Sequence, residues 1–287
     1  MKEKVKRVLA KFVFQLYEKQ ILKNKIFVNS IEQTIDHMLT TEDSLVRFGD
    51  GEIKLISGKE IPLQKPDQRL IERLKEILQT EEQGVCIALP DIFSGLSAYT
   101  DRSRNFWMEH LLFHCKEYKQ YCSNRKYENA FFSRPYIMYK NKDICFSRFE
   151  KIKHIWNGKK IVFVEGNTTH NGVGVDLFET AASIERIICP SSQAWEKYEE
   201  ILTICKKNSP DRLILISLGT AGKVLAVDLH RLGYRSIDIG NLDMEYEWFL
   251  GGDIEKRRLL KHEICNRQEN EAAGYFDYLQ QIIAIIH

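Results

Sequence analysis

The sequence lacks several features that mark specialised classes of protein. It has no low-complexity run, no linker rich in glycine, proline or serine, and no apolar stretch near the roughly 18 residues that span a bilayer. Since 42 basic side chains face 40 acidic ones, the net charge is only +2, which argues against a dedicated nucleic-acid binder. Lys11 and Glu18 interrupt the N-terminal apolar residues, so we expect no secretory signal. What remains is the composition of an ordinary globular protein.

The seven cysteines lack the spacing of a metal site or a disulfide framework. Their number is odd, and no CxxC pair or local Cys/His cluster occurs. The sequence therefore predicts no structural zinc site. Cys86 and Cys189 stand in apolar segments, which favours reduced, buried thiols in a cytoplasmic protein.

The first 25 residues form a basic, amphipathic segment. Eight Lys and Arg residues face only Glu3 and Glu18, a local net charge of +6. Apolar residues recur at helical spacing, namely Val5, Val8, Leu9, Phe12, Val13 and Leu16. Such a helix can lie on an anionic membrane surface, or it can dock its apolar stripe on the protein core. We therefore divide the chain into a helical arm, residues 1–30, and a single domain, residues 31–287.

Beyond the arm, short apolar strands alternate with helices. Strands are predicted at residues 44–48, 85–89, 160–165, 186–189, 212–217 and 236–239, and helices at residues 66–80, 101–120, 192–207 and 220–232. Residues 254–286 are predicted to be mostly helical. The alternation predicts an α/β fold: a Rossmann-like, mostly parallel sheet with helices on both faces, plus N- and C-terminal helical segments. Ligands bind such sheets at the carboxyl ends of the strands, so we examine the segments that follow them.

The first candidate segment follows residues 44–48. Asp50 and Glu52 flank a glycine, and two carboxylates this close on a turn can face one divalent cation, Mn²⁺ or Mg²⁺. Gly49 would let the backbone approach a ligand, and Arg47 is a candidate partner for phosphate. The alternative is structural, with Asp50 capping a short helix and Glu52 lying favourably in its first turn.

A long polar loop with three glycines follows residues 160–165. The glycines are Gly166, Gly172 and Gly174. Backbone amides in such a loop suit a phosphate or a nucleotide, although the glycine spacing matches neither a dinucleotide fingerprint nor a Walker loop. His170 could contact a phosphate or act as an acid or base, or it could be a solvated loop histidine. Asp176 fits the cap of a following helix equally well.

A third segment joins a buried strand to a helix and contains Gly219, Thr220 and Lys223. Small residues at a helix start let an anion sit on the free amides, with Lys223 one turn further along. Tight packing of a helix on a sheet needs the same small residues, so both explanations stay open.

Acidic and apolar residues alternate after the last predicted strand. In an extended chain Asp243, Glu245 and Glu247 would share one face. One of them could act as a general base or help to hold a metal, and we favour Glu245 as the base; an exposed acidic edge is the alternative. Three aromatic residues could stack on a base or a sugar, although core positions are the more frequent outcome: Trp195, Tyr246 and Trp248.

Taken together and in order, six segments resemble bacterial glycosyltransferases of the GT-D fold. They are Val-Arg-Phe-Gly-Asp-Gly-Glu (46–52), Leu-Pro-Asp (89–91), Phe-Phe-Ser-Arg-Pro-Tyr (131–136), Val-Glu-Gly with Gly-Val-Gly-x-Asp-Leu-Phe (164–178), Leu-Gly-Thr-Ala (218–221) and Ile-Asp-Ile-Gly-x-x-Asp-x-Glu-Tyr-Glu-Trp (237–248). The chain departs from the family pattern at His170, Val175, Asn241 and residues 220–223.

The resemblance implies metal-dependent transfer of a sugar from a nucleotide sugar, typically UDP-glucose, to a bacterial surface glycan or a glycosylated adhesin. The family's Asp-x-Glu metal motif falls on Asp50 and Glu52. Arg47, His170 and Lys223 are then candidate positive partners for developing phosphate charge. The acceptor glycan would be linked to protein or to lipid, and for a lipid-linked acceptor the basic arm would hold the enzyme at the inner face of the plasma membrane.

Two other functions stay open. A non-catalytic, sugar-nucleotide-binding subunit of a glycan assembly machine would fit the altered loops, whereas the intact Asp50 and Glu52 oppose it. A methyltransferase would need a glycine-rich turn directly after Glu165, and the glycine-rich part of this loop comes too late.

Overall fold

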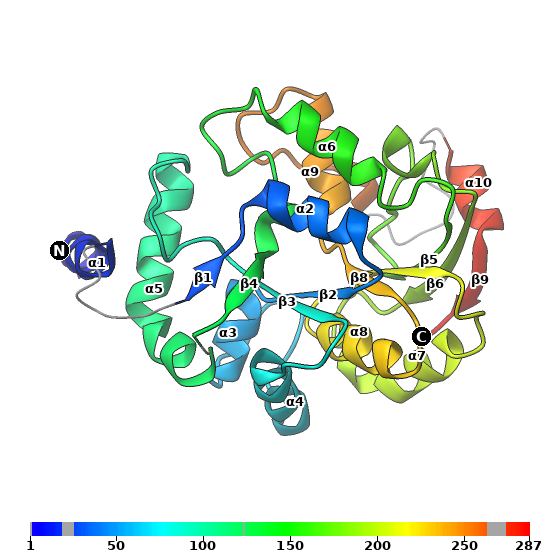
Figure 1. The fold of residues 1–287 in the computed structure, drawn as a ribbon, viewed down its shortest axis with the longest axis horizontal. Coiled ribbons are helices and arrows are strands. Elements are labelled where there is room, and N and C mark those ends of the chain that lie inside the picture. Colours follow the sequence, from blue (N-terminus) through cyan, green and yellow to red (C-terminus); the bar gives the residue numbers. More distant parts are fainter. Residues whose placement is uncertain (1, 19–25, 123, 263–273) are drawn as a thin grey trace.

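A nine-stranded sheet runs through the molecule (Figure 1). The computed structural model describes residues 2–18, 26–122, 124–262 and 274–287. Within these residues every strand pairing of the sheet is parallel, in the order β1-β4-β3-β2-β8-β7-β5-β6-β9. The strands are β1 (Phe27–Val28), β2 (Ser44–Arg47), β3 (Val85–Leu89), β4 (Lys126–Asn129), β5 (Lys160–Gly166), β6 (Ser183–Cys189), β7 (Leu213–Ser217), β8 (Ser236–Asp238) and β9 (Ile282–Ile285).

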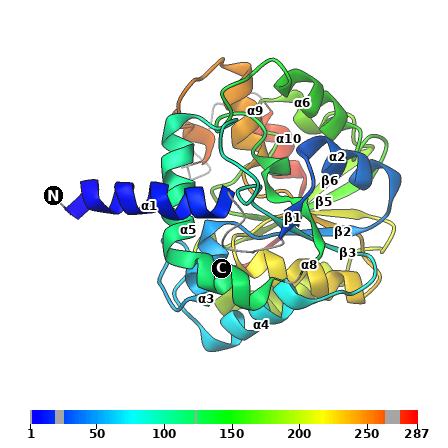
Figure 2. The same ribbon diagram turned by 60° about the vertical axis from the view of Figure 1, so that its left-hand side comes forward.

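Helices cover both faces of this sheet. Helices α3, α4, α7 and α8 lie on one face and α2, α6 and α9 on the other, while α5 and α1 lie beyond β1 (Figures 1 and 2). The helices are α1 (Lys2–Glu18), α2 (Ile31–Thr40), α3 (Asp50–Ile56), α4 (Gln68–Gln79), α5 (Asp101–Tyr121), α6 (Cys145–Lys153), α7 (Tyr198–Cys205), α8 (Ala221–Arg231), α9 (Leu242–Leu250) and α10 (Tyr275–Gln280). The predicted Rossmann-like α/β architecture is confirmed.

All six predicted strands are present, because each is a short apolar run that the sheet buries on both faces. The sequence did not reveal β1, β4 or β9. Strand β4 reads Lys-Tyr-Glu-Asn and resembles a loop. Its Glu128 is nevertheless buried, because Asn29 and Thr34 donate hydrogen bonds of 3.0 and 2.6 Å to the carboxylate. Hydrogen bonds from residues far away in the sequence thus allow a polar segment to be buried as a strand.

The C-terminal segment was predicted to be mostly helical, and its described residues differ from this at the end, where a strand forms. Only α10 and a 3₁₀ turn (Leu260–His262) are helical within its described residues, and β9 pairs in parallel with β6 at the sheet edge. Consecutive apolar residues fit a buried helix and a strand equally well by pattern. Here the strand forms, because the backbone N–H and C=O groups at the outer edge of β6 need hydrogen-bond partners and β9 supplies them.

The arm forms the predicted helix, α1, which packs on α5 and projects from the body (Figure 2). Ala10 and Phe14 are buried in the main core. Four large apolar side chains of the same helix are 51–69% exposed: Val5, Val8, Leu9 and Phe12. The apolar stripe is therefore only partly docked. In the described residues no helix combines the length and the hydropathy that crossing a bilayer requires.

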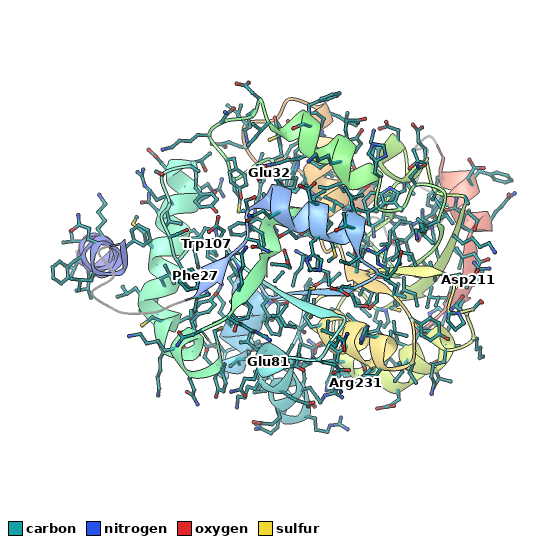
Figure 3. All side chains as sticks on the ribbon, in the orientation of Figure 1. Phe27, Glu32, Glu81, Trp107, Asp211 and Arg231 are labelled. Carbon is teal, nitrogen blue, oxygen red and sulfur yellow. The ribbon has the colours of Figure 1, made fainter. Side chains whose placement is uncertain are left out.

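Side chains fill the layers between the sheet and the helices, while charged residues such as Glu81, Asp211 and Arg231 lie at the periphery (Figure 3). The core includes the three aromatic residues considered for stacking, Trp195, Tyr246 and Trp248. The cysteines differ from the prediction of buried thiols. Cys145, Cys189 and Cys205 are buried, but Cys86, Cys115 and Cys122 are half-buried, and Cys265 lies outside the described residues.

Candidate active site

The segments that follow β2, β8 and β7 meet at one edge of the sheet, which we call the carboxyl edge. These strands are neighbours in the sheet although β8 lies far from β2 in the sequence. The strand order changes direction here, because β3 and β4 lie on one side of β2 and β7 and β5 on the other side of β8. Open α/β sheets bind ligands at such a point.

A buried network of four charges joins these strand ends. The Arg47 guanidinium donates to Asp238 Oδ1 at 2.8 Å and to the Asp238 carbonyl at 2.6 Å. Lys223 Nζ lies 2.8 Å from Asp238 Oδ2 and 3.4 Å from Glu52 Oε1. All four side chains are at most 10% exposed. The two predicted phosphate partners, Arg47 and Lys223, thus have their charges paired inside the protein.

Asp238 is the centre of this network. Burial alone would raise the pKa of its carboxyl group, but the charges of Arg47 and Lys223 outweigh burial and hold the pKa below its ordinary value of 3.8. Gly240 lies against the same guanidinium, where any Cβ atom would collide with Arg47 Nη2. The sequence did not single out Asp238, because a lone aspartate at a strand end carries no local signal of its partners.

We expect Asp238→Asn to lower the free energy of unfolding by about 2–3 kcal/mol, because it removes the charge that two buried cations share. Thermal unfolding should show a Tm lower by roughly 5–10 °C. The native carboxylate contributes stability that is complete above its ordinary pKa of 3.8 and is lost as pH falls through the lowered folded-state pKa. The variant should lack this acid dependence. Asp211→Asn, at an exposed carboxylate, is the control, and an equal loss there would contradict the prediction.

The Asp-x-Glu motif starts a helix and does not form an open turn. Gly49 is the N-cap of α3, and its amide donates to Glu52 Oε2 at 2.7 Å. Asp50 is therefore the first helical residue, not the cap. Two residues apart on a helix, the carboxylates of Asp50 and Glu52 project in different directions. Joint coordination of one cation by these two carboxylates stays a prediction.

Asp50 is the more accessible of the two carboxylates, with 37% of its side chain exposed. Its Oδ2 lies 2.6 Å from Lys54 Nζ. Burial would raise the pKa of Asp50, but Lys54, His110 and Arg134 lower it below the ordinary value. Asp50 is consequently ionised at neutral pH.

The charge of Arg134 acts on Asp50 and on Glu245 of α9. It helps to lower the pKa of Asp50, and at Glu245 it opposes the effect of burial. Glu245 is fully buried, and its Oε2 accepts hydrogen bonds from the amides of Tyr136 and Ile137 at 3.1 and 2.9 Å. Burial dominates and raises the pKa of Glu245 above its ordinary value. Its Oε1 has no hydrogen-bond partner within the described part of the chain.

The three acidic residues after β8 lie on helix α9, not on an extended strand as predicted, so they do not share one face. Asp243 and Glu247 project together. Lys261 Nζ lies 2.8 Å from Asp243 Oδ2 and 2.6 Å from Glu247 Oε1, and His262 lies against both carboxylates. An ammonium thus already compensates part of the negative charge of this pair.

The glycine-rich loop after β5 is fastened to its surroundings by buried polar contacts. Glu165 Oε1 pairs with Arg186 at 2.6 Å, and Glu165 Oε2 accepts from the Asn171 amide at 2.9 Å. The Gly172 amide donates to Asp243 Oδ1 at 2.8 Å, which joins the loop to α9. Side chains at Gly166 and Gly172 would collide with Ser191 and Phe178. Packing therefore accounts for these two glycines without a ligand.

His170 is not the solvated loop histidine that the sequence allowed. It is 3% exposed, has a left-handed φ of 49° and packs 4.8 Å from the Tyr278 ring. Burial lowers the pKa of His170. Asp176 is not a helix cap, because Val175 is the N-cap of the 3₁₀ turn and Asp176 is its first residue. The Asp176 carboxylate lies 2.7 Å from Lys153 Nζ.

The backbone at the start of α8 has free space beside it. Gly219 has a left-handed φ of 52°, and a Cβ atom there would meet nothing within 4 Å. The hydroxyl of Thr220 is buried and has no hydrogen-bond partner in the described residues. A helix N-terminus combined with an unpartnered buried hydroxyl suits an anion.

A family model described as glycosyltransferase GT-D fold matches residues 45–268, which cover every element of the carboxyl edge. The chain belongs to the GT-D glycosyltransferase family. The expectation from the six sequence segments is thus confirmed.

Relatives of this GT-D protein include two curated streptococcal proteins. The chain is 41% identical over 266 residues to a probable glycosyl transferase, Gly, of Streptococcus gordonii, and 37% identical over 265 residues to glycosyltransferase GlyD of Streptococcus pneumoniae. Each match covers 91% of this chain but only 39% and 33% of the relatives. The chain therefore spans about two fifths or less of these relatives' length.

Solved structures share the whole fold. A structure presented as a conserved domain of unknown function 1792 with a distinct glycosyltransferase fold has a TM-score of 0.87 and 37% identity, with 98% of this chain and 100% of that chain covered. A new glycosyltransferase from Streptococcus sanguinis has a TM-score of 0.85 and 39% identity, with 91% and 100% covered.

Arg134 is a residue near the candidate site of this GT-D protein that the sequence analysis did not single out. It stands in the Phe-Phe-Ser-Arg-Pro-Tyr segment, directly after a short 3₁₀ helix that follows β4. The signal was a lone arginine at the end of a strand that was itself not predicted. In the structure the charge of Arg134 acts on the pKa values of two carboxyl groups, Asp50 and Glu245, that follow different strands.

Proposed function

We propose that this protein is a metal-dependent glycosyltransferase that moves a sugar, glucose in the first instance, from a UDP-sugar to a bacterial surface glycan or glycoprotein glycan. The observation that carries the proposal is a pair of carboxyl groups that follow the neighbouring strands β2 and β8. Asp50 is accessible and its pKa is lowered, whereas Glu245 is buried and its pKa is raised. Two carboxyl groups with opposite pKa shifts are typical of a site that separates electrostatic from acid–base tasks.

The donor diphosphate would bind between α8 and Arg134. The open backbone at Gly219 and the unpartnered hydroxyl of Thr220 offer donors to phosphate oxygens at the helix N-terminus. Arg134 would neutralise charge on the leaving nucleoside diphosphate. In this assignment Arg47 and Lys223 support the site by holding Asp238 and Glu52, and do not contact phosphate.

Mn²⁺ or Mg²⁺ fits this site through Asp50, whose carboxylate is ionised and half-buried at the edge. When bound, the ion would neutralise diphosphate charge as the sugar leaves. Glu52 fits less well as a second ligand, because its oxygens already contact the Gly49 amide and Lys223. We assign it to holding the start of α3 in position.

Glu245 is suited to be the general base if the reaction inverts the anomeric centre. The Tyr136 and Ile137 amides fix one oxygen, and the other is left for the proton of the acceptor hydroxyl. A raised pKa brings the carboxylate closer to the pKa range in which proton transfer is efficient.

Calorimetry with UDP, with and without Mn²⁺, tests the donor part of this proposal. We expect binding that depends on the metal, and then UDP release in the presence of UDP-glucose and an acceptor glycan. The same affinity for UDP with and without Mn²⁺ would contradict a metal-dependent donor site. Metal-dependent UDP binding without any transfer, over a panel of UDP-sugars, would favour the non-catalytic subunit, which the internal pairing of Arg47 and Lys223 also fits.

We also propose that α1 binds an anionic membrane surface and so brings the enzyme to a lipid-linked acceptor. The first 25 residues carry a net charge of +6, and an apolar stripe of α1 is solvent-exposed. Val8→Glu/Phe12→Glu should weaken association with phosphatidylglycerol vesicles roughly tenfold or more, while Ala10 and Phe14 keep α1 docked.

Vesicle co-sedimentation measures this effect. Deleting residues 1–25 should abolish association without abolishing UDP binding. Phe276→Glu, at another exposed phenylalanine far along the chain, should leave association unchanged. Equal association of wild type and the α1 variants would contradict a membrane role for the arm.

A further inference from the structure

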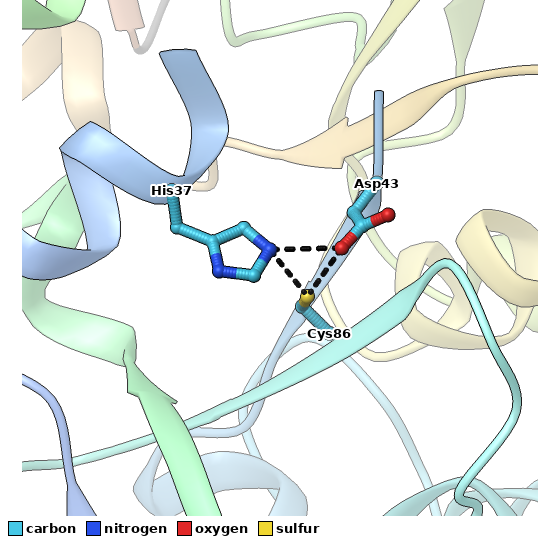
Figure 4. Close-up of side chains that lie close together, drawn as sticks. All are labelled: His37, Asp43 and Cys86. Carbon is cyan, nitrogen blue, oxygen red and sulfur yellow. Dashed lines mark hydrogen bonds and ion pairs between the residues drawn. The ribbon is translucent and has the colours of Figure 1, made fainter. Parts of the chain in front are cut away.

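Three different metal-ligand side chains meet at the opposite edge of the sheet, where β2 and β3 begin. His37 lies in the last turn of α2, Asp43 just before β2, and Cys86 near the start of β3 (Figure 4). Nε2 of His37 lies 2.8 Å from Asp43 Oδ2 and 3.5 Å from Cys86 Sγ, and the sulfur lies 3.5 Å from the same Oδ2. One nitrogen, one oxygen and one sulfur thus face a common point.

We propose that His37, Asp43 and Cys86 bind one Zn²⁺, with water as the fourth ligand. Tetrahedral zinc bonds of the usual lengths place a ligand nitrogen and oxygen about 3.3 Å apart, and a sulfur about 3.6 Å from either. The observed separations of 3.5 Å from the sulfur already match, and only the 2.8 Å pair must widen. Mixed thiolate, imidazole and carboxylate ligands select zinc over Mg²⁺ or Ca²⁺.

Glu128 supplies the support that a zinc-bound histidine needs. Its Oε1 lies 3.3 Å from His37 Nδ1, so the other ring nitrogen is directed at the cluster. Asn29 and Thr34 in turn hold the Glu128 carboxylate. A carboxylate behind a histidine fixes the ring and its tautomer in many zinc sites.

Over the part of the chain that the structure describes, the negative charge of the cluster is not compensated by a lysine or arginine in an ion pair, so a cation can bind there. In the described residues the Asp43 carboxylate pairs only with His37 and with no lysine or arginine. Burial and the carboxylates of Asp43 and Glu128 raise the pKa of the Cys86 thiol, although Arg125 acts in the opposite direction. A bound Zn²⁺ would take the place of the Cys86 thiol proton and of any proton on His37 Nε2, because a ligand atom must be free of its proton.

The other cluster of possible ligands differs in this respect. Asp243, Glu247 and His262 also lie close together, but Lys261 Nζ is within 2.8 Å of both carboxylates and takes the place of a cation. The His37 site is half-buried, so an ion can reach it. Zinc there would tie α2 to β2 and β3, far from the donor site.

Cobalt(II) titration of the untagged 287-residue chain tests the proposal, because Co²⁺ reports thiolate ligation and tetrahedral geometry by its absorption. We expect one equivalent to give an ultraviolet thiolate-to-cobalt band with intense visible bands, which Zn²⁺ then abolishes. Cys86→Ser and His37→Gln should lose these bands, and Glu128→Gln should weaken binding by about 10- to 100-fold. Circular dichroism checks that each variant is folded.

Two controls separate this site from others. Cys115→Ser removes another half-buried thiol and should keep the bands, and so should Asp50→Ala, which removes the metal ligand of the donor site. Excess zinc should raise the Tm of wild type by roughly 5–10 °C at a hundredfold excess over Kd, and not that of Cys86→Ser. No thiolate band in wild type, or a band that survives in Cys86→Ser, would overturn the proposal.

Discussion

Asp50→Asn is expected to reduce the rate of sugar transfer by about 10²- to 10³-fold and to abolish the effect of Mn²⁺ on UDP binding. The change removes a carboxylate that is ionised and accessible at the carboxyl edge. The fold should persist, because the contact with Lys54 is a part-exposed pair of the kind that contributes less than about 1 kcal/mol. Initial rates of UDP release and calorimetry measure the two effects.

Two comparison variants show whether the loss belongs to Asp50. Asp36→Asn changes an exposed carboxylate on α2 that pairs with Lys151 at 3.0 Å, and it should behave as wild type. Glu52→Gln should lower the Tm, since it weakens the cap of α3 and the pairing with Lys223. Retention of metal-dependent UDP binding in Asp50→Asn would show that Asp50 is not the metal ligand.

Glu245→Gln is expected to reduce the transfer rate by about 10²- to 10⁴-fold, the usual effect of losing a positioned general base. The Tm at neutral pH should stay the same or rise. Burial raises the pKa of Glu245, so its ionised form is disfavoured in the folded protein, and a neutral amide avoids this cost. Loss of activity without loss of stability would separate a chemical role from a structural one.

The pH dependence follows from the same shift. A raised folded-state pKa means that the proton on Glu245 stabilises the native state below the ordinary pKa of 4.5, and that this stabilisation is lost as pH rises through the raised value. The wild-type rate should rise over the same window, because the base must be ionised. Glu245→Gln should lose this dependence.

Glu247→Gln is the matched variant on the same helix. It breaks the contact with Lys261 and should lower the Tm while it keeps the pH profile of the rate. If Glu247→Gln abolished transfer and Glu245→Gln did not, the assignment of the base to Glu245 would be wrong.

The fold class was predictable because its signals are local. Each buried strand of the centre is a short apolar run, so its pattern survives in any window of the sequence. The Asp-x-Glu segment and the glycine-rich loop were visible for the same reason. The outer strands of the sheet were harder to predict from the sequence. Strand β4 is polar, and β9 is an apolar run whose pattern fits a helix or a strand.

Short-range patterns in the sequence specify the parallel α/β architecture and the family, and they place the candidate site at the carboxyl ends of the strands. The part that each charge plays depends on contacts that form only when the chain folds. Lys223 pairs with Asp238, and the charge of Arg134 acts on both Asp50 and Glu245. The cluster of His37, Asp43 and Cys86 likewise escapes any search for CxxC spacing, because its third member comes from another strand. Parallel strands need long crossover connections, so neighbours in space are distant in sequence, and charge pairing, burial and pKa depend on neighbours in space.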